Sequence, residues 1–482
     1  MLTIRRAPGQ DHPAVGATSG SGRHAVGWSR GTPDLEGRTE VRGRHLSARP
    51  GRSGGPRSLP WGRPRTRWGH RRTVTASRPD RDRRPPAEET ALNAPDDHPG
   101  TPGAGVPTFR LLDADGTRLV DPAHPAPEPG SPAETSFLLG ALREMTLVRR
   151  MDTEATALQR QGELALWASA LGQEAAQVGA AGALRAADHV FPSYREHGIA
   201  FCRGVAPLEL LSLFRGVDFG GWDTERTGFG LYTLVVGAQT LHATGYAMGI
   251  QRDGLVGNGS ADGSAGSGAG DAAVLAAFGD GATAQGDVNE AMIWAGVMNA
   301  PVVFFCQNNQ WAISAPSDRQ SAAPIYRRAE GFGFPGVRVD GNDVLATHAV
   351  VAAALARART GQGPTLVEAF TYRMAAHTTA DDATRYREAG DDAHWRERDP
   401  IARVQTYLRA GGHLDEAAAA RLAAESDELA RAIRSGVRAM PDPDEALLFQ
   451  HAYATLPDEL RQQRDEWTAY RATLGDPVGS QA

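Results

Sequence analysis

The residues best suited to chemistry are Gly279-Asp280-Gly281 and, after 26 intervening residues, Asn308-Asn309. A carboxylate and an amide oxygen are hard ligands that suit Mg²⁺, which takes one or two protein carboxylates and completes its octahedron with phosphate and water. The glycines on both sides of Asp280 let a phosphate approach the backbone. A helix that begins just after this turn would offer free N–H groups to an anion. The pattern therefore predicts a site for magnesium and a diphosphate.

Two apolar runs, 272–278 and 302–306, lead into these motifs, and a helical pattern at 286–298 separates them. A strand, a helix and a second strand form a crossover that places both strand ends at one edge of a parallel sheet. Open α/β sheets bind their ligands at this edge. The sequence therefore predicts an α/β fold, mainly a parallel sheet flanked by helices, with Asp280 and Asn309 side by side.

The spacing of the two motifs resembles the signature of thiamine diphosphate enzymes. The surrounding stretches resemble the alpha subunit of the decarboxylase (E1) component of 2-oxo acid dehydrogenase complexes over residues 106–460. These stretches are GDGATAQGDVNEAMIWAGVMNAPVVFFCQNNQWAIS (279–314), VFPSYREHG (190–198), VVGAQTLHATGYAMG (235–249), and residues 159–184, 335–343, 363–373 and 377–387. The resemblance implies that thiamine diphosphate and Mg²⁺ are the cofactors.

The resemblance also assigns roles to single residues. It implies that the side chains of Asp280 and Asn309 and the backbone carbonyl of Trp311 bind Mg²⁺. A guanidinium fork suits phosphate oxygens, and the family pattern places Arg195 on the diphosphate. The remaining cofactor contacts that it implies are Tyr194, backbone groups of Leu234 and Val236 beside the aminopyrimidine, and N–H groups of Gly281 and Ala282 toward the diphosphate.

His377 lies in HTTADD, and by resemblance it helps to transfer the acyl group to a lipoyl arm. Histidine suits this task because its charge changes near neutral pH. The loop after it carries a phosphorylated serine in animal relatives. Thr378 stands at the matching position here, which puts that control in doubt.

Thiamine diphosphate needs a carboxylate against its aminopyrimidine, and in related heterotetramers a glutamate of the beta subunit supplies it. Glu290, on the helix after the GDG turn, is a poor substitute and is expected to serve packing or a subunit contact. The resemblance therefore implies an α2β2 assembly with a beta subunit, and a lipoylated E2 acyltransferase as acceptor. It also implies that this chain is inactive alone.

The resemblance implies a small 2-oxo acid as substrate, and several alternatives stay open. TADDATRYR resembles branched-chain enzymes, whereas QNNQWAIS resembles bacterial pyruvate enzymes. Gln307 and Leu234 both depart from the animal pattern. A pocket difference of one or two methylenes shifts selectivity by only about 1–3 kcal/mol. We favour a branched-chain acid of the 3-methyl-2-oxobutanoate type. Pyruvate, acetoin and a non-catalytic paralogue are the alternatives.

Composition agrees with this interpretation. The chain has 482 residues and 41% hydrophobic content, enough for one large or two ordinary domains. No apolar run is long enough for a transmembrane span. The two cysteines, Cys202 and Cys306, form no CxxC pair and no disulfide framework, which suits a reducing cytoplasm. All 51 basic residues are arginines, so no lysine can form a Schiff base.

Residues 1–105 differ from the rest because Arg, Gly, Pro and Ser dominate them; residues 1–84 hold 19 arginines against 6 acids. Such a segment buries too little apolar surface to offset its ordering entropy. We expect a disordered extension, and a start codon assigned too far upstream is one explanation for it. A transit peptide and a nucleic-acid tail are weaker alternatives. A secretory signal is excluded because no apolar segment follows the basic residues.

The rest divides into an N-terminal arm (106–135), a cofactor-binding domain (136–440) and a C-terminal tail (441–482). Within these, the pattern predicts a strand-turn-strand at 109–119, a proline-rich connector at 122–132, and helices at 136–159, 172–184 and 415–434. Residues 254–271 are almost entirely Gly, Ser, Ala and Asp, and we expect a flexible surface insertion there.

Overall fold

The computed structural model describes residues 105–121, 124, 126–218, 220–256, 271–443, 445, 447–450 and 453–474. The expected N-terminal extension, except for Gly105, and residues 257–270 of the expected insertion lie outside the described residues. All described residues fall within one compact unit, 84–482. This unit contains every motif that the sequence predicts to do chemistry.

A five-stranded parallel sheet forms the centre of this unit, in the order β1-β2-β3-β7-β6. Its strands are β1 (His189–Phe191), β2 (Val274–Gly279), β3 (Val302–Asn308), β6 (Gly336–Asp340) and β7 (Thr365–Phe370). β2 and β3 pair in parallel with Phe278 opposite Cys306, and α7 (Gly286–Met298) connects them. The expected strand-helix-strand unit is confirmed, and so is the α/β fold.

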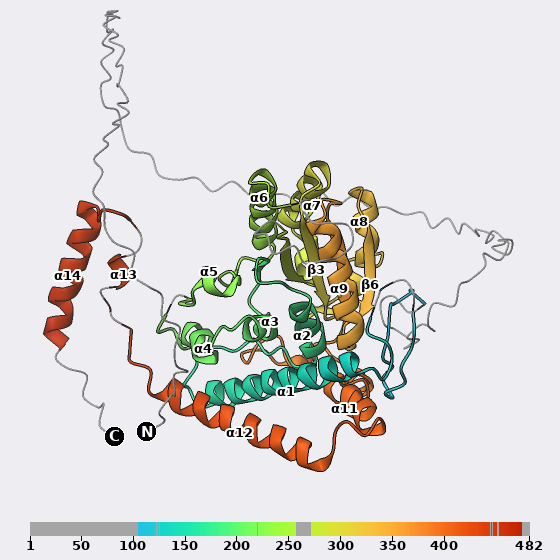
Figure 1. Cartoon of the computed structure of the whole chain (residues 1–482). Helices are drawn as coiled ribbons and strands as arrows, with labels where there is room; N and C mark the ends of the chain where they lie inside the picture. Colours follow the sequence, from blue (N-terminus) through green and yellow to red (C-terminus); the bar gives the residue numbers. More distant parts are fainter. Residues whose placement is uncertain are drawn as a thin grey trace, which may run out of the picture. The chain divides into compact units, whose positions relative to one another are not determined.

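Side chains of the central strands alternate between two apolar layers. Leu275 and Ala277 of β2 face one core, whereas Val274, Ala276 and Phe278 face the other. On one side α9 (Val344–Arg359) packs on the sheet and on α2 (Glu174–Gly182); on the other side α6 (Ala238–Arg252) packs on the sheet and on α7 (Figure 1). Burial on both faces explains why these strands are continuous apolar runs rather than alternating ones.

Ten further α-helices occur among the described residues. They are α1 (Pro132–Arg160), α3 (His197–Cys202), α4 (Pro207–Arg215), α5 (Thr224–Thr227), α8 (Arg328–Gly331), α10 (Ala389–Arg396), α11 (Pro400–Ala410), α12 (Glu416–Arg438), α13 (Leu447–Gln450) and α14 (Asp458–Leu474). A small antiparallel pair joins β4 (Trp311–Ala312) to β5 (Ala315–Pro316). None of the described helices is long and apolar enough to cross a bilayer.

The helix boundaries differ from the expected ones where capping residues decide. α1 begins at Pro132, inside the expected connector, because the Ser131 side chain accepts the Glu134 N–H and proline fits the first turn. α12 continues through Gly436 to Arg438. The expected strand-turn-strand at 109–119 is reduced to an isolated antiparallel bridge between Leu112 and Arg118.

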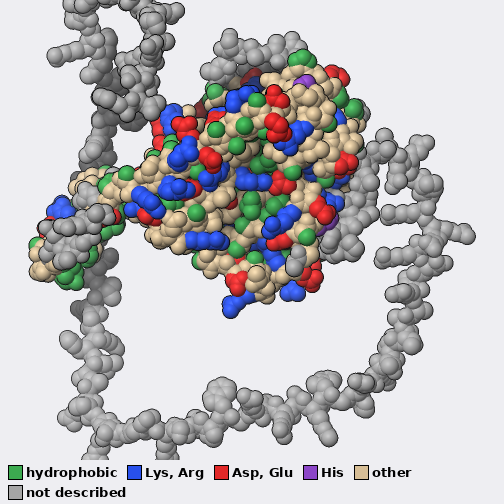
Figure 2. Space-filling view, turned by 90° about the horizontal axis from the view of Figure 1, so that it is seen from below, with side chains coloured by type: hydrophobic (Ala, Val, Ile, Leu, Met, Phe, Trp, Pro, Cys, Tyr) green, Lys and Arg blue, Asp and Glu red, His purple; other side chains and the backbone are tan. Residues whose placement is uncertain are grey.

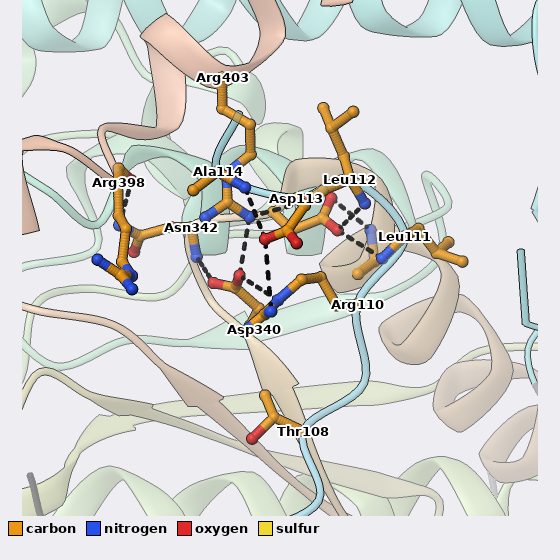
Figure 3. Close-up of polar contacts among 12 residues, drawn as sticks. Thr108, Arg110, Leu111, Leu112, Asp113, Ala114, Asp340, Asn342, Arg398 and Arg403 are labelled. Atoms are coloured by element: carbon orange, nitrogen blue, oxygen red, sulfur yellow. Dashed lines mark hydrogen bonds and ion pairs between the residues drawn. The ribbon is translucent and has the colours of Figure 1, made fainter. Parts of the chain in front are cut away.

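A buried polar cluster fastens the N-terminal arm to the carboxyl end of β6 (Figure 3). One Asp340 oxygen receives hydrogen bonds from Arg110 (3.1 Å) and Arg403 (2.8 Å). Asp343 caps α9 with one oxygen, and with the other it accepts the backbone N–H groups of Leu111 and Leu112 at 2.7 and 2.6 Å. The motif VDGND at 339–343 therefore has a structural role in holding the arm.

Ion pairs border the contact between α1 and α12. Arg434 donates to Glu154 at 2.7 and 2.8 Å, and Arg143 pairs with Glu425. Figure 2 shows basic and acidic side chains interspersed over the face of the molecule seen from below.

Candidate cofactor site

A cavity of about 240 Å³ opens at the carboxyl ends of β2 and β3. Nine of the ten residues that the sequence analysis assigned to the site line it: Tyr194, Arg195, Val236, Asp280, Gly281, Ala282, Asn309, Trp311 and His377. Leu234 does not; its side chain is 67% exposed beside the cavity loop. The role expected of Leu234 rests on its backbone, so this position leaves that prediction open.

Asp280 stands directly after β2, at the start of the short 3-10 helix η1 (Asp280–Ala284), and is buried. One of its oxygens lies 3.4 Å from Ser317 Oγ and 3.2 Å from Gln320 Nε2. Burial raises the pKa of Asp280 to about 6, against the opposing charge of Arg373. A carboxylate in this state is stabilised by a bound cation.

Asn309 is held by a network of buried amides. Its Nδ2 donates to Gln173 Oε1 at 2.9 Å, and its Oδ1 accepts the N–H of Trp311 at 3.2 Å. Gln307 accepts hydrogen bonds from Gln173 and Gln177 and donates to Glu196 Oε1 at 2.8 Å. Gln307, a departure from the animal pattern, thus supports the loop behind Asn309. The sequence analysis assigned no role to Gln173, although its stretch was recognised.

The loop after Asn309 is clamped by Arg373, which the sequence analysis also missed. This buried guanidinium donates to the carbonyl oxygens of Trp311 and Ile313, each at 2.9 Å. Ile313 has a φ of 55°, and a β-branched residue in the left-handed region is strained. Arg373 therefore fixes the carbonyl that the resemblance assigns to the metal. Its second lone pair leaves that carbonyl able to accept another partner.

Arg195 and Arg373 both contact His377. Arg195 NH2 donates to the His377 carbonyl at 2.7 Å, and the guanidinium groups of Arg195 and Arg373 lie 3.3 and 3.2 Å from His377 Nδ1. Because guanidinium groups only donate, Nδ1 is the acceptor and the proton is on Nε2. Nε2 lies 3.4 Å from the Tyr194 hydroxyl. Burial and then the charges of Arg195 and Arg373 lower the pKa of His377 to about 4.

These groups fit a hard divalent cation together with an anion. The cation donors are one carboxylate, one amide oxygen and one backbone carbonyl, and no cluster of three or more His, Cys, Asp or Glu occurs among the described residues. That composition suits Mg²⁺, with oxygen atoms of a ligand and water completing the shell. At Gly281, an added Cβ would lie 2.7 Å from the Ala312 Cβ, so only glycine lets the two loops approach.

A parallel sheet with a polar, charged cavity at the carboxyl ends of its strands is the arrangement of cofactor-dependent α/β enzymes. Residues 142–441 match the family model of the dehydrogenase E1 component. The chain belongs to this family, as its sequence motifs indicated.

Three relatives illustrate the range of similarity. The chain is 45% identical to 3-methyl-2-oxobutanoate dehydrogenase subunit alpha of Mycobacterium tuberculosis, over 67% of this chain and 85% of that protein. It is 31% identical to the human mitochondrial 2-oxoisovalerate dehydrogenase subunit alpha, over 81% and 90%. It is 32% identical to the Bacillus subtilis pyruvate dehydrogenase E1 component subunit alpha, over 75% and 92%.

Proposed function

We propose that this chain is the alpha subunit of a 2-oxo acid dehydrogenase E1 component that acts on a branched-chain acid of the 3-methyl-2-oxobutanoate type. The observation that carries the reaction class is the convergence of Asp280, Asn309, Arg195 and His377 in one cavity. The 45% identity to the mycobacterial relative, against 32% to the bacterial pyruvate relative, favours the branched-chain substrate.

Thiamine diphosphate with Mg²⁺ fits the cavity as the bound group. Asp280, Asn309 and the Trp311 carbonyl would hold the metal. Arg195, with Tyr194 beside it and the N–H groups of Gly281 and Ala282, would hold the diphosphate. When bound, the thiazolium ring supplies the carbon nucleophile and the electron sink that decarboxylation requires.

His377 would serve the reacting end of the cavity. With Nδ1 facing two guanidinium groups, the ring stays neutral near pH 7 and presents its Nε2–H. From there it would donate a hydrogen bond to the substrate or to the incoming lipoyl group, the proposed acyl acceptor on E2. Arg195 and Arg373 fix which nitrogen carries the proton, because neither can accept one.

A beta subunit would complete the site. Among the described residues that line the cavity, the acids are Asp280 and Glu196. Asp280 would hold the metal, and Glu196 already accepts hydrogen bonds from Gln307 and the Arg195 N–H. The carboxylate that activates the aminopyrimidine would therefore come from the partner.

Exposed apolar side chains support such a partner. Beside the cavity, one loop exposes Leu231, Leu234, Val235 and Val236, and helices α6 and α7 expose Tyr246, Ile293, Trp294 and Val297. Contiguous exposed apolar residues of this kind mark protein contacts. Glu290 accepts the indole N–H of Trp294 at 2.8 Å, so it orients a residue of this surface.

Pyruvate is the second candidate substrate. The 32% identity to the Bacillus subtilis pyruvate relative is close to the 31% identity to the human branched-chain relative. The loop sequence QNNQWAIS agrees with this alternative.

One assay tests the proposal and separates the substrates. The chain is co-expressed with the beta-type gene nearest to it and supplied with thiamine diphosphate, Mg²⁺ and either 3-methyl-2-oxobutanoate or pyruvate. We expect decarboxylation only with both subunits, faster with the branched-chain acid, and abolished by Asp280→Ala. Turnover by the chain alone, or full activity of the Asp280→Ala variant, would contradict the proposal.

A further inference from the structure

Asp152, in the C-terminal half of α1, is a buried carboxylate that contacts the irregular segment at residues 167–170. Its Oδ1 accepts the indole N–H of Trp167 at 2.8 Å and the backbone N–H of Ala170 at 3.0 Å, and its Oδ2 accepts the Ser169 hydroxyl at 2.6 Å. It is only 4% exposed. A single carboxylate thus receives three donors from four consecutive residues, which fixes the conformation of the 167–170 segment.

The same segment contacts the Arg195 side chain and the loop that carries His377. The Ser169 carbonyl accepts a hydrogen bond from Arg195 NH1. Two hydrogen bonds join the backbone of Trp167 to the loop of His377. The backbone N–H of Trp167 donates to Thr379 Oγ1 at 3.0 Å, and its carbonyl accepts the Thr379 N–H at 2.9 Å. Arg195 and the His377 loop therefore share one support.

A third contact extends this support to the loop that leads into α6. His197 Nε2 donates to the Ala168 carbonyl at 2.9 Å, and its Nδ1 accepts the Tyr232 hydroxyl at 2.7 Å. The His197 ring also stacks on Trp167 with centroids 4.2 Å apart. Tyr232 precedes Leu234 and Val236, so this loop too is positioned through the 167–170 segment.

We propose that Asp152 is a positioning residue of the cofactor site, which acts through the 167–170 segment on Arg195 and on the loop of His377. The inference rests on the proposed function for what those two residues do, but not for how they are held. A charged acceptor makes stronger hydrogen bonds than a neutral one. Loss of the charge should therefore loosen the segment and, with it, the Arg195 side chain and the loop of His377.

The test uses Asp152→Asn in the full-length chain. Asparagine has nearly the same shape and no negative charge. Its oxygen can still accept the Trp167 and Ala170 N–H groups, but its amide group cannot accept the Ser169 hydroxyl and must donate to it instead. Glu154→Gln is the matched control: Glu154 lies one half-turn further along α1 and is 2% exposed, but it pairs with Arg434 on α12. Ser169→Ala is a second variant that deletes the bond to Oδ2 and the bond from the Leu171 N–H to the Ser169 hydroxyl, while the Asp152 charge and its other two bonds remain.

The first readout is amide hydrogen exchange in the peptide covering residues 375–382, which requires no cofactor. For Asp152→Asn we expect exchange at Thr379 to accelerate on the order of tenfold, since the Thr379 N–H donates to the Trp167 carbonyl in the 167–170 segment. Ser169→Ala should change exchange in the same direction but less, and Glu154→Gln should leave it unchanged. Unchanged exchange in both Asp152→Asn and Ser169→Ala, or equal acceleration in Glu154→Gln, would overturn the inference.

The second readout is the affinity of the two-subunit complex for magnesium thiamine diphosphate, measured by tryptophan fluorescence. We expect it to weaken on the order of tenfold in Asp152→Asn and to stay unchanged in Glu154→Gln. If the unmodified complex does not bind thiamine diphosphate, the proposed function fails, while the exchange experiment still decides the role of Asp152. If it binds and Asp152→Asn binds equally well, the positioning role is refuted.

Discussion

Replacement of Arg373 should separate the stability of the chain from its affinity for an anionic ligand. The two hydrogen bonds from its guanidinium to the carbonyls of Trp311 and Ile313 contribute about 1.5–3 kcal/mol each, because the donor is charged. Burial, with the nearby charge of Arg195, lowers the pKa of Arg373 to about 10. That shift corresponds to a cost of about 3 kcal/mol for holding the charge in the folded protein.

These opposing terms predict an unusual order of variants. Arg373→Met loses both hydrogen bonds but also the buried charge, for a net loss of about 0–3 kcal/mol. Arg373→Lys keeps the charge but cannot reach both carbonyls from one nitrogen, so it should be about 1 kcal/mol less stable than Arg373→Met. Affinity for magnesium thiamine diphosphate should follow the reverse order, since only lysine retains a positive charge for the diphosphate.

Urea unfolding of the chain gives the first order, and a fluorescence titration of the two-subunit complex gives the second. Arg434 provides the control, because its side chain is 43% exposed and pairs with Glu154 at the edge of α12. There, lysine should be at least as stable as methionine. An Arg373→Lys variant that is more stable than Arg373→Met by over about 1 kcal/mol would refute the balance of burial against hydrogen bonding.

Three further predictions concern other parts of the chain. The pKa of His377, lowered to about 4, makes the folded chain bind this proton less tightly than the unfolded chain; stability from His377 should be lost as pH falls from about 6.5 toward 4, and His377→Gln should flatten the melting temperature over that window. Asp340→Asn should cost about 3–5 kcal/mol in urea unfolding, because it leaves Arg110 and Arg403 without their shared carboxylate, whereas Asp465→Asn at an exposed pair should cost little. Val297→Glu, at a position 77% exposed, should leave the melting temperature of the chain unchanged but abolish co-elution with the beta subunit.

The central strands and α7 could be predicted closely because local signals agreed with the tertiary structure. Strands buried on both faces must be apolar throughout, and β2 and β3 are. α7 ends where Asn299 takes a φ of 52°, a left-handed cap that asparagine tolerates. The order of β6 and β7 in the sheet could not be read in this way, because it depends on how the sheet is assembled and not on local pattern.

The residues of the site likewise differ in how far the sequence predicts them. Residues at strand ends, such as Asp280 and Asn309, were predictable because the crossover brings strand ends together. Their partners were not, because they come from distant segments: Gln173 is 136 positions away from Asn309, and Arg373 is 62 away from Trp311. Both partners lie in stretches that resemble the family, but sequence alone gives no distance between them.

The charges of the cavity argue for a ligand that is both cation and anion. Arg195 and Arg373 point toward the same nitrogen of His377, and like charges held close together in a buried site favour an anion between or beside them. Asp280 needs a positive partner instead: burial raises its pKa to about 6, and a bound cation would stabilise its charged form. A simple anion would relieve the arginines but oppose the carboxylate, and a bare metal ion would do the reverse. A magnesium diphosphate would satisfy both groups at once, which supports the proposed cofactor over either ion alone.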